Sequence, residues 1–172
     1  MPDKRQCILN LINENTVCAE IGVWKGDFSR KIIKNNPKHL YLIDPWKYQE
    51  YEGRWYSIEQ EKMENIYQNV KRDFLNFQNV SIIRDFSENV KFQKEMLDLI
   101  YIDGNHSYEF VLKDLNHYYK FMKKKSYITG DDYGWTDRHC KRGPATAVRE
   151  FCKINKLNFE VINRQFIIRL EK

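Results

Sequence analysis

The chain has 172 residues and a mass of 21.0 kDa, which suits one globular domain spanning residues 1–172 with a sizeable core. Its formal charge of +5 and sequence pI of about 8.9 come from Lys and Arg residues spread along the whole chain, so they indicate a solvated surface rather than a dense nucleic-acid-binding tract. No apolar run approaches the ~18 residues of a membrane span, and the first residues lack a signal-peptide core, so we expect neither a membrane-spanning nor an exported protein.

The first half of the chain reads as two strands, each followed by a turn or loop. Apolar positions with helical spacing predict a short capping helix within residues 1–15. A strand over 16–21 leads through the glycine-containing turn 22–26 into a helix, and residues 39–43 form a second strand. The segment 46–57 is dense in aromatic residues and has no regular period, so we expect a lid loop folded over a site. Such a loop could stack on a ligand ring or simply pack over a cofactor.

Helices and strands alternate through the second half of the chain. The predicted elements are a helix over 58–77, a strand over 80–83, a helix over 88–95, a strand over 98–102, a helix over 107–124, a strand over 126–129, a helix over 145–155 and a hairpin of 159–162 and 165–170. Strands that alternate with helices and end in an antiparallel pair predict an α/β fold with a doubly wound, mostly parallel sheet of seven strands. Flavodoxin-type and dinucleotide-binding folds usually lack such a terminal hairpin.

The turn after the first strand has the spacing of a nucleoside site. Glu20, Gly22 and Gly26 form the pattern E-x-G-x-x-x-G, which differs from the G-x-G-x-x-G of dinucleotide binding. The glycines let the backbone approach a ligand closely, and Asp44 at the end of the second strand is placed to accept hydrogen bonds from ribose hydroxyls. We therefore predict a site for a nucleoside without a pyrophosphate, although any strand-to-helix turn can carry glycine.

Acidic residues follow two later strands. Asp103 and the pair Asp131 and Asp132 come after predicted strands, and the carboxyl ends of parallel strands meet at the ligand-binding edge of the sheet. Their oxygens suit a hard cation such as Mg²⁺, which would stabilise the alkoxide of a substrate hydroxyl. His106 is the candidate general base, because an unperturbed histidine pKa of about 6.5 suits proton removal at neutral pH. The alternatives are a helix cap at Asp103, a turn at Asp131 and Asp132, and a surface histidine.

Several blocks of the sequence resemble one enzyme family. They are AEIGVWKGDFS, YLIDPW, DLIYIDGNHSYEFVLKDL, GDDYGW and GPATAVREF, which occur in this order between about Val17 and Phe151. These blocks resemble the class I S-adenosylmethionine-dependent methyltransferases, and within them the small-molecule O-methyltransferases related to macrocin O-methyltransferase and the cephalosporin hydroxylase-like group. The resemblance implies a Rossmann-like methyltransferase fold, in which an antiparallel strand lies beside strand five, and S-adenosylmethionine as the cofactor.

The resemblance also assigns roles to residues around the predicted site. It implies that acids at the positions of Asp103, Asp131 and Asp132 bind a divalent cation in metal-dependent members, and that His106 occupies the position of a Lys or His base. The residues implied to contact the cofactor are Glu20, Gly22 and Gly26 at its methionine end, Asp44 at the ribose, Asp85, Phe86 and Ser87 at the adenine, and Asp103 beside them.

The leading prediction is transfer of a methyl group from S-adenosylmethionine to a hydroxyl of a sugar or another small molecule, with divalent-metal assistance and His106 as the general base. A nicotinamide-dependent oxidoreductase could have a similar sheet, but the second glycine of G-x-G-x-x-G is missing. The positive charge and many aromatic residues would suit a nucleic-acid-binding protein, which predicts a steep dependence of affinity on salt. Neither alternative explains two acid-bearing strand ends.

The same sequence features indicate where the protein is located and what it binds. The four cysteines form no CxxC pair and no zinc-ligand spacing, which favours reduced, partly buried thiols in a cytoplasmic protein. We expect a small-molecule or glycan acceptor, no membrane association and no nucleic acid partner. The chain has little beyond its core, so the acceptor site is either shallow or completed by another subunit of a homo-oligomer.

Overall fold

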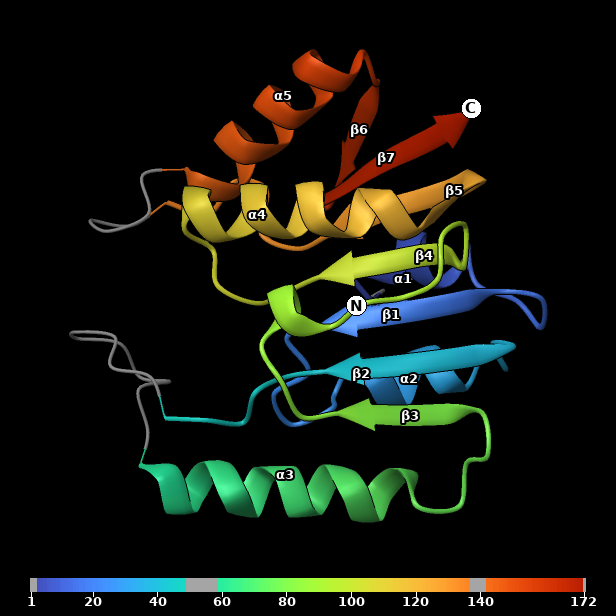
Figure 1. Ribbon diagram of the computed structural model, residues 1–172, viewed down its shortest axis with the longest axis vertical. Coiled ribbons are helices and arrows are strands. Elements are labelled where there is room, and N and C mark those ends of the chain that lie inside the picture. The colour runs from blue at the N-terminus through green and yellow to red at the C-terminus, as the bar shows by residue number, and fades with distance from the viewer. Residues whose placement is uncertain (1–2, 49–58, 137–141, 172) are drawn as a thin grey trace.

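The computed structural model describes residues 3–48, 59–136 and 142–171, which form an α/β structure (Figure 1). These residues contain a seven-stranded sheet with the order β3-β2-β1-β4-β5-β7-β6. Its strands are β1 (Val17–Ile21), β2 (His39–Ile43), β3 (Val80–Ile83), β4 (Leu97–Ile102), β5 (Met122–Gly130), β6 (Phe159–Ile162) and β7 (Gln165–Glu171). Strands β1 to β5 pair in parallel, whereas β7 is antiparallel to both β5 and β6. The predicted doubly wound sheet with an antiparallel hairpin is confirmed.

Helices cover both faces of this sheet. They are α1 (Gln6–Leu9), α2 (Ser29–Ile33), α3 (Gln60–Phe74), α4 (Tyr108–Tyr118) and α5 (Gly143–Asn155), with short 3₁₀ helices η1 (Ser87–Asn89) and η2 (Tyr119–Phe121). Buried side chains of α1, α2 and α3 share one core, and those of α4 and α5 share the core on the opposite face. In Figure 1, α4 lies in front of the sheet and α1 and α2 lie behind it. Within the described ranges, no helix is long and apolar enough to cross a membrane.

The helix predicted over 88–95 is wrong. After η1 the backbone is extended at Val90, with φ −79° and ψ 125°, and Glu95 adopts the left-handed region with φ 55°. Val90 is buried, and the Phe92 ring packs edge-on against Tyr41 with a centroid distance of 4.8 Å. Packing against the sheet therefore outweighs the local helical preference of this segment.

The helix predicted over 107–124 ends at Tyr118, and β5 begins earlier than residue 126. Met122 pairs in register with Leu97 of β4. Lys123 Nζ also donates a hydrogen bond to the Asp98 carboxylate on β4 at 2.8 Å. Because of these contacts with β4, the lysine-rich residues 123–125 are part of strand β5 and not of the preceding helix.

The predicted capping helix within residues 1–15 is a single turn, α1. Most of the predicted aromatic lid loop over 46–57 lies outside the described residues. At its start, Trp46 is fully buried, and its indole N–H donates a hydrogen bond to the carbonyl of Trp24 at 2.9 Å. Trp46 therefore fastens the turn after β2 to the turn after β1.

Candidate functional site

A cavity of about 450 Å³ opens at the carboxyl ends of β1, β2 and β4. Figure 1 shows the arrowheads of these strands at the same side of the sheet, the edge where parallel sheets bind ligands. The predicted cofactor residues that line this cavity, hereafter the cofactor pocket, are Glu20, Gly22, Asp44, Phe86, Ser87 and Asp103. Its volume is within the usual range for small-molecule sites. Six of the predicted cofactor residues therefore line one cavity, whose occupant stays a prediction.

Gly22 brings two strand ends close together at the floor of the pocket. It has φ 86°, and a Cβ atom built on it would lie 2.4 Å from the Asp103 carbonyl oxygen and 2.6 Å from Gly104 Cα. The turn after β1 thus packs directly on the turn after β4, where no side chain fits. Only glycine combines this backbone conformation with this contact.

Gly26 and Asp85 lie outside the pocket lining and hold turns. Gly26 has φ 75°, and its N–H donates a hydrogen bond to the Val23 carbonyl at 2.9 Å. The Asp85 carboxylate accepts hydrogen bonds from the Phe86 N–H and from Asn89 Nδ2, both at 2.7 Å. Both residues were predicted to contact the cofactor. In the structure they shape the turns next to the pocket and do not line it.

Glu20 and Asp44 are the acids at the ends of β1 and β2. Glu20 is 1% exposed and accepts a hydrogen bond from the Ser29 hydroxyl, and burial raises its pKa to about 8. Asp44 accepts hydrogen bonds from the N–H groups of Trp24 at 2.9 Å and Trp46 at 2.7 Å. Burial raises the pKa of Asp44, and these backbone donors oppose the rise. Since each carboxylate oxygen can accept more than one hydrogen bond, Asp44 can also accept from a diol in the pocket.

Asp114 is a buried acid in the pocket that sequence reasoning missed. It is 5% exposed on the inner face of α4, and its carboxylate accepts a hydrogen bond from the Ser87 hydroxyl at 2.5 Å. Burial raises its pKa to about 6. The signal was present, because an acid lies among the apolar positions Val111, Leu115 and Tyr118 that define the buried face of this helix.

Two of the three predicted metal ligands, Asp103 and Asp131, accept hydrogen bonds from the guanidinium group of Arg5. Arg5 Nη2 donates hydrogen bonds to Asp103 Oδ2 at 2.7 Å and to Asp131 Oδ2 at 2.5 Å, and Arg5 Nε donates to Asp131 Oδ2 at 3.1 Å. These carboxylates raise the pKa of Arg5 above its usual range, although burial alone would lower it. The guanidinium in turn outweighs the effect of burial at Asp131 and holds the pKa of that carboxyl below its ordinary value.

The third predicted ligand, Asp132, faces a different cation. Arg164 Nη2 lies 2.7 Å from Asp132 Oδ1. Among the described side chains, no group of three or more His, Cys, Asp and Glu residues has an arrangement that could hold a metal ion. The predicted acids therefore meet at one edge, but their geometry does not support the predicted divalent cation.

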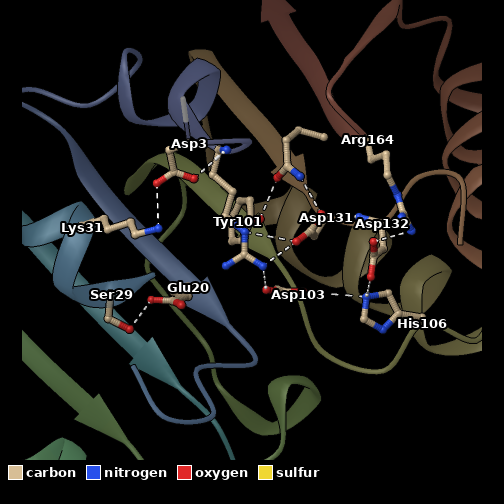
Figure 2. Close-up of polar contacts among 12 residues, drawn as sticks. Asp3, Glu20, Ser29, Lys31, Tyr101, Asp103, His106, Asp131, Asp132 and Arg164 are labelled. Atoms are coloured by element: carbon tan, nitrogen blue, oxygen red, sulfur yellow. Dashed lines mark hydrogen bonds and ion pairs between the residues drawn. The ribbon is translucent and has the colours of Figure 1, made fainter. Parts of the chain in front are cut away.

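His106 lies against two of these acids, as Figure 2 shows. Its Nε2 atom is 3.4 Å from Asp132 Oδ2 and 3.7 Å from Asp103 Oδ1. The imidazole also packs against Trp135, with a centroid distance of 5.6 Å and an interplanar angle of 32°. His106, Asp103, Asp131 and Asp132 all line the cofactor pocket, so the predicted base and acids lie together at its β4–β5 end.

A second cavity of about 320 Å³ adjoins the first. Both cavities are lined by Arg5, Phe28, Asp131 and Asp132, and the second is otherwise bordered by polar groups that include Arg164 of the β6–β7 turn. We call it the polar cavity. The two cavities therefore share two of the predicted acids, Asp131 and Asp132, whereas His106 lines the cofactor pocket.

The chain resembles methyltransferases in sequence. A profile of the family described as methyltransferase domain matches residues 19–133. An uncharacterized protein of Acanthamoeba polyphaga mimivirus is 30% identical over 122 residues, which cover 67% of this chain and 50% of that protein. The chain therefore spans about half the length of the curated relative it matches.

The chain also resembles methyltransferases of known structure. A putative methyltransferase from Streptococcus mutans, solved with S-adenosylhomocysteine, is 12% identical, with 99% of each chain covered and a TM-score of 0.65. A SAM-dependent methyltransferase from Aquifex aeolicus is 14% identical, with 97% of this chain and 88% of that chain covered and a TM-score of 0.64. The O-methyltransferase NovP is 19% identical, with coverage of 98% and 78% and a TM-score of 0.63. At these identities, the likeness shows a common fold.

Proposed function

This chain belongs to the methyltransferase domain family and has the class I methyltransferase fold, and we propose that it transfers the methyl group of S-adenosylmethionine to a hydroxyl group of a small molecule. The observation that carries this proposal is the junction of two cavities. The cofactor pocket has the strand-end features of a nucleoside site. The polar cavity shares Asp132 with it, and Asp132 lies 3.4 Å from the His106 imidazole. A donor and an acceptor could therefore face each other at one point, as a direct transfer requires.

The pocket residues suit S-adenosylmethionine, which when bound supplies an electrophilic methyl group on its sulfonium. Gly22 lets the turns after β1 and β4 pack directly on each other, so that both line the pocket. Asp44 would accept hydrogen bonds from the ribose hydroxyls, and Phe86 would pack against the adenine. Glu20 and Asp103 would border the methionine end at the ends of β1 and β4.

His106 would remove the proton of the acceptor hydroxyl as the methyl group is transferred. A hydroxyl is a weak nucleophile, and a positioned base accelerates such steps by about 10² to 10⁴ fold. Asp132, which Arg164 holds from its other side, would stabilise the imidazolium that forms. The carboxylates that would bind a divalent ion are engaged by arginines, so these residues do not fit a divalent ion.

We propose a hydroxyl-rich acceptor, such as a sugar, for the polar cavity. Its lining combines the acceptors Asp131 and Asp132 with the donors Asn163, Arg164 and Gln165. A polyol can donate to the carboxylates and accept from the amide and guanidinium groups at the same time. An apolar acceptor would offer these polar groups no further hydrogen bonds.

Calorimetric titration of S-adenosylhomocysteine tests the cofactor half of the proposal. We expect the wild type to bind, and Asp44→Ala to bind at least about tenfold more weakly because two or more hydrogen bonds to the ribose and the neighbouring turns are lost. Asp73→Ala is the matched control, because Asp73 is an exposed acid on α3 that pairs with Arg30. The absence of heat with the wild type would refute the proposal.

A further inference from the structure

The acids that follow β4 and β5, hereafter the acidic edge, are paired with a cation of the chain itself, the Arg5 guanidinium. We infer that Arg5 takes the place of a divalent cation between Asp103 and Asp131, an inference that rests on the methyl transfer proposed for this site. Asp103 and Asp131 follow neighbouring strands, since Ile102 of β4 pairs with Gly130 of β5. The Arg5 guanidinium bridges the two carboxylates through Nη2. A metal ion bound by the same oxygens at about 2.1 Å would have to displace it.

The guanidinium is fixed from several directions. Its plane lies over the rings of Phe28, with 4.9 Å from Cζ to the centroid, and Tyr101, with 5.4 Å. Such cation–π contacts favour arginine because its cation is planar and weakly hydrated. The Arg5 N–H donates a hydrogen bond to Asp3 at 3.0 Å, and Asp3 pairs with Lys31 at 2.7 Å. The segment before α1 is thus fastened to α2 and places Arg5 in one position.

Asp131 is held by a second group as well. Gln165 Nε2 donates a hydrogen bond to Asp131 Oδ1 at 2.5 Å, and Gln165 Oε1 accepts one from the Tyr101 hydroxyl at 2.7 Å. Asp131 thus receives Arg5 on Oδ2, and both Gln165 and the Asp132 N–H, at 2.6 Å, on Oδ1. This full set of partners leaves the two oxygens directed at protein donors, whereas a metal site would direct them at a common open point.

One end of the guanidinium stays available for a ligand. Arg5 Nε and Nη2 donate to the carboxylates, and within the described part of the chain Nη1 has no hydrogen-bond partner. Arg5 lines both the cofactor pocket and the polar cavity. We therefore assign Nη1 the task of donating to the acceptor oxygen at the junction of the cavities, where a metal-dependent enzyme would use its ion.

Manganese alone provides a test that needs neither cofactor nor acceptor. We would titrate Mn²⁺ into the wild type, Arg5→Ala, Arg5→Gln and Arg5→Lys, and follow free Mn²⁺ by electron paramagnetic resonance. Removing the guanidinium leaves Asp103, Asp131 and Asp132 with less compensating charge, so the two neutral variants should bind Mn²⁺ at least about tenfold more tightly than the wild type. Arg5→Lys keeps the charge and should resemble the wild type.

Two further variants separate this role from general stability. Adding Asp131→Asn to Arg5→Gln should abolish the gained Mn²⁺ affinity, whereas Arg169→Gln, which removes an exposed arginine paired with Glu171, should leave wild-type behaviour. Mn²⁺ binding by the wild type that equals or exceeds that of both neutral variants, including no binding by any of them, would overturn the inference. Failure of the wild type to bind S-adenosylhomocysteine would instead overturn the proposed function, since the Mn²⁺ comparison does not involve that ligand.

Discussion

At the scale of single residues, the charge balance of the site depends on which cation each acid is paired with. Asp132 lies between Arg164 and His106, with separations of 2.7 Å and 3.4 Å. Asp103 is reached by Arg5 at 2.7 Å, and its other oxygen is 3.7 Å from His106. The imidazole therefore lies between two carboxylates, and each of these carboxylates is paired with an arginine on its other oxygen. A proton gained by His106 would be balanced by this neighbouring negative charge.

His106→Gln tests this arrangement. Because glutamine cannot accept the hydroxyl proton, methyl transfer to a hydroxylated acceptor found by screening should fall by about 10² fold or more. The affinity for S-adenosylhomocysteine should change by less than about threefold, since the nucleoside contacts are untouched. His39→Gln is the control, because His39 lies at the start of β2, at the opposite edge of the sheet, and bonds Ser81. An unchanged transfer rate in His106→Gln would exclude the proposed base.

At the scale of elements, α4 carries an acid into the apolar layer. The pKa of Asp114 rises from 3.8 to about 6 on burial. Between these values the folded chain retains a proton that the unfolded chain releases, so the free energy of unfolding falls as the pH rises through this window. The carboxylate then remains a destabilising group at neutral pH, although the Ser87 hydroxyl partly compensates it.

Asp114→Asn should remove this pH dependence. Asparagine can still accept the Ser87 hydrogen bond but cannot ionise, so the variant should gain on the order of 2 kcal/mol in free energy of unfolding at pH 7 relative to the wild type. Near pH 4 the two chains should differ little. Urea unfolding between pH 4 and pH 7.5 measures the effect, with exposed Asp73→Asn as the control. A difference that does not vary with pH would contradict the assignment.

The elements that sequence reasoning placed correctly are those with strong local signals. In β4, Leu99 and Tyr101 enter one core and Ile100 and Ile102 enter the other, so an uninterrupted apolar run marks the strand. The segment 88–95 has no such signal, because its side chains pack as an extended connection that only the neighbouring strands explain. Long-range packing, which a local pattern does not record, decides such segments.

The residues of the candidate site also fall into two groups, those that a local sequence pattern predicts and those that it does not. Gly22, Asp44 and His106 were predicted because each follows a recognisable strand. Arg5 was not, since its partner Asp103 lies 98 residues away and nothing in the spacing around Arg5 distinguishes it from a surface arginine. The predicted metal ion followed from the acids alone, and the missing information was the cation that the chain brings to them.

At the scale of the whole molecule, the cofactor pocket joins turns from several strands, so a ligand there should stabilise the entire sheet. At a concentration of S-adenosylhomocysteine near 100 times its dissociation constant, the free energy of unfolding should rise by about 2.7 kcal/mol. For a chain of this length, that corresponds to an increase in Tm on the order of 5–10 °C.

Differential scanning calorimetry of the wild type and Asp44→Ala checks this expectation. The variant should show a much smaller shift at the same ligand concentration, because its site is weakened while its sheet is retained. Adenosine alone should give a smaller shift than S-adenosylhomocysteine, since it leaves the methionine end of the pocket empty. Equal shifts in both chains would place the ligand elsewhere.

The position of Gln165 at the start of β7 has a consequence for the order in which the protein matures. Asp131 receives one partner from the segment before α1 and another from the strand that is inserted last beside β5. Because β7 is the last strand in the chain, Asp131 can gain its Gln165 hydrogen bond only after the hairpin of β6 and β7 has docked on β5. The geometry of the acidic edge therefore depends on both ends of the chain, and it is complete only when the whole sequence has been synthesised.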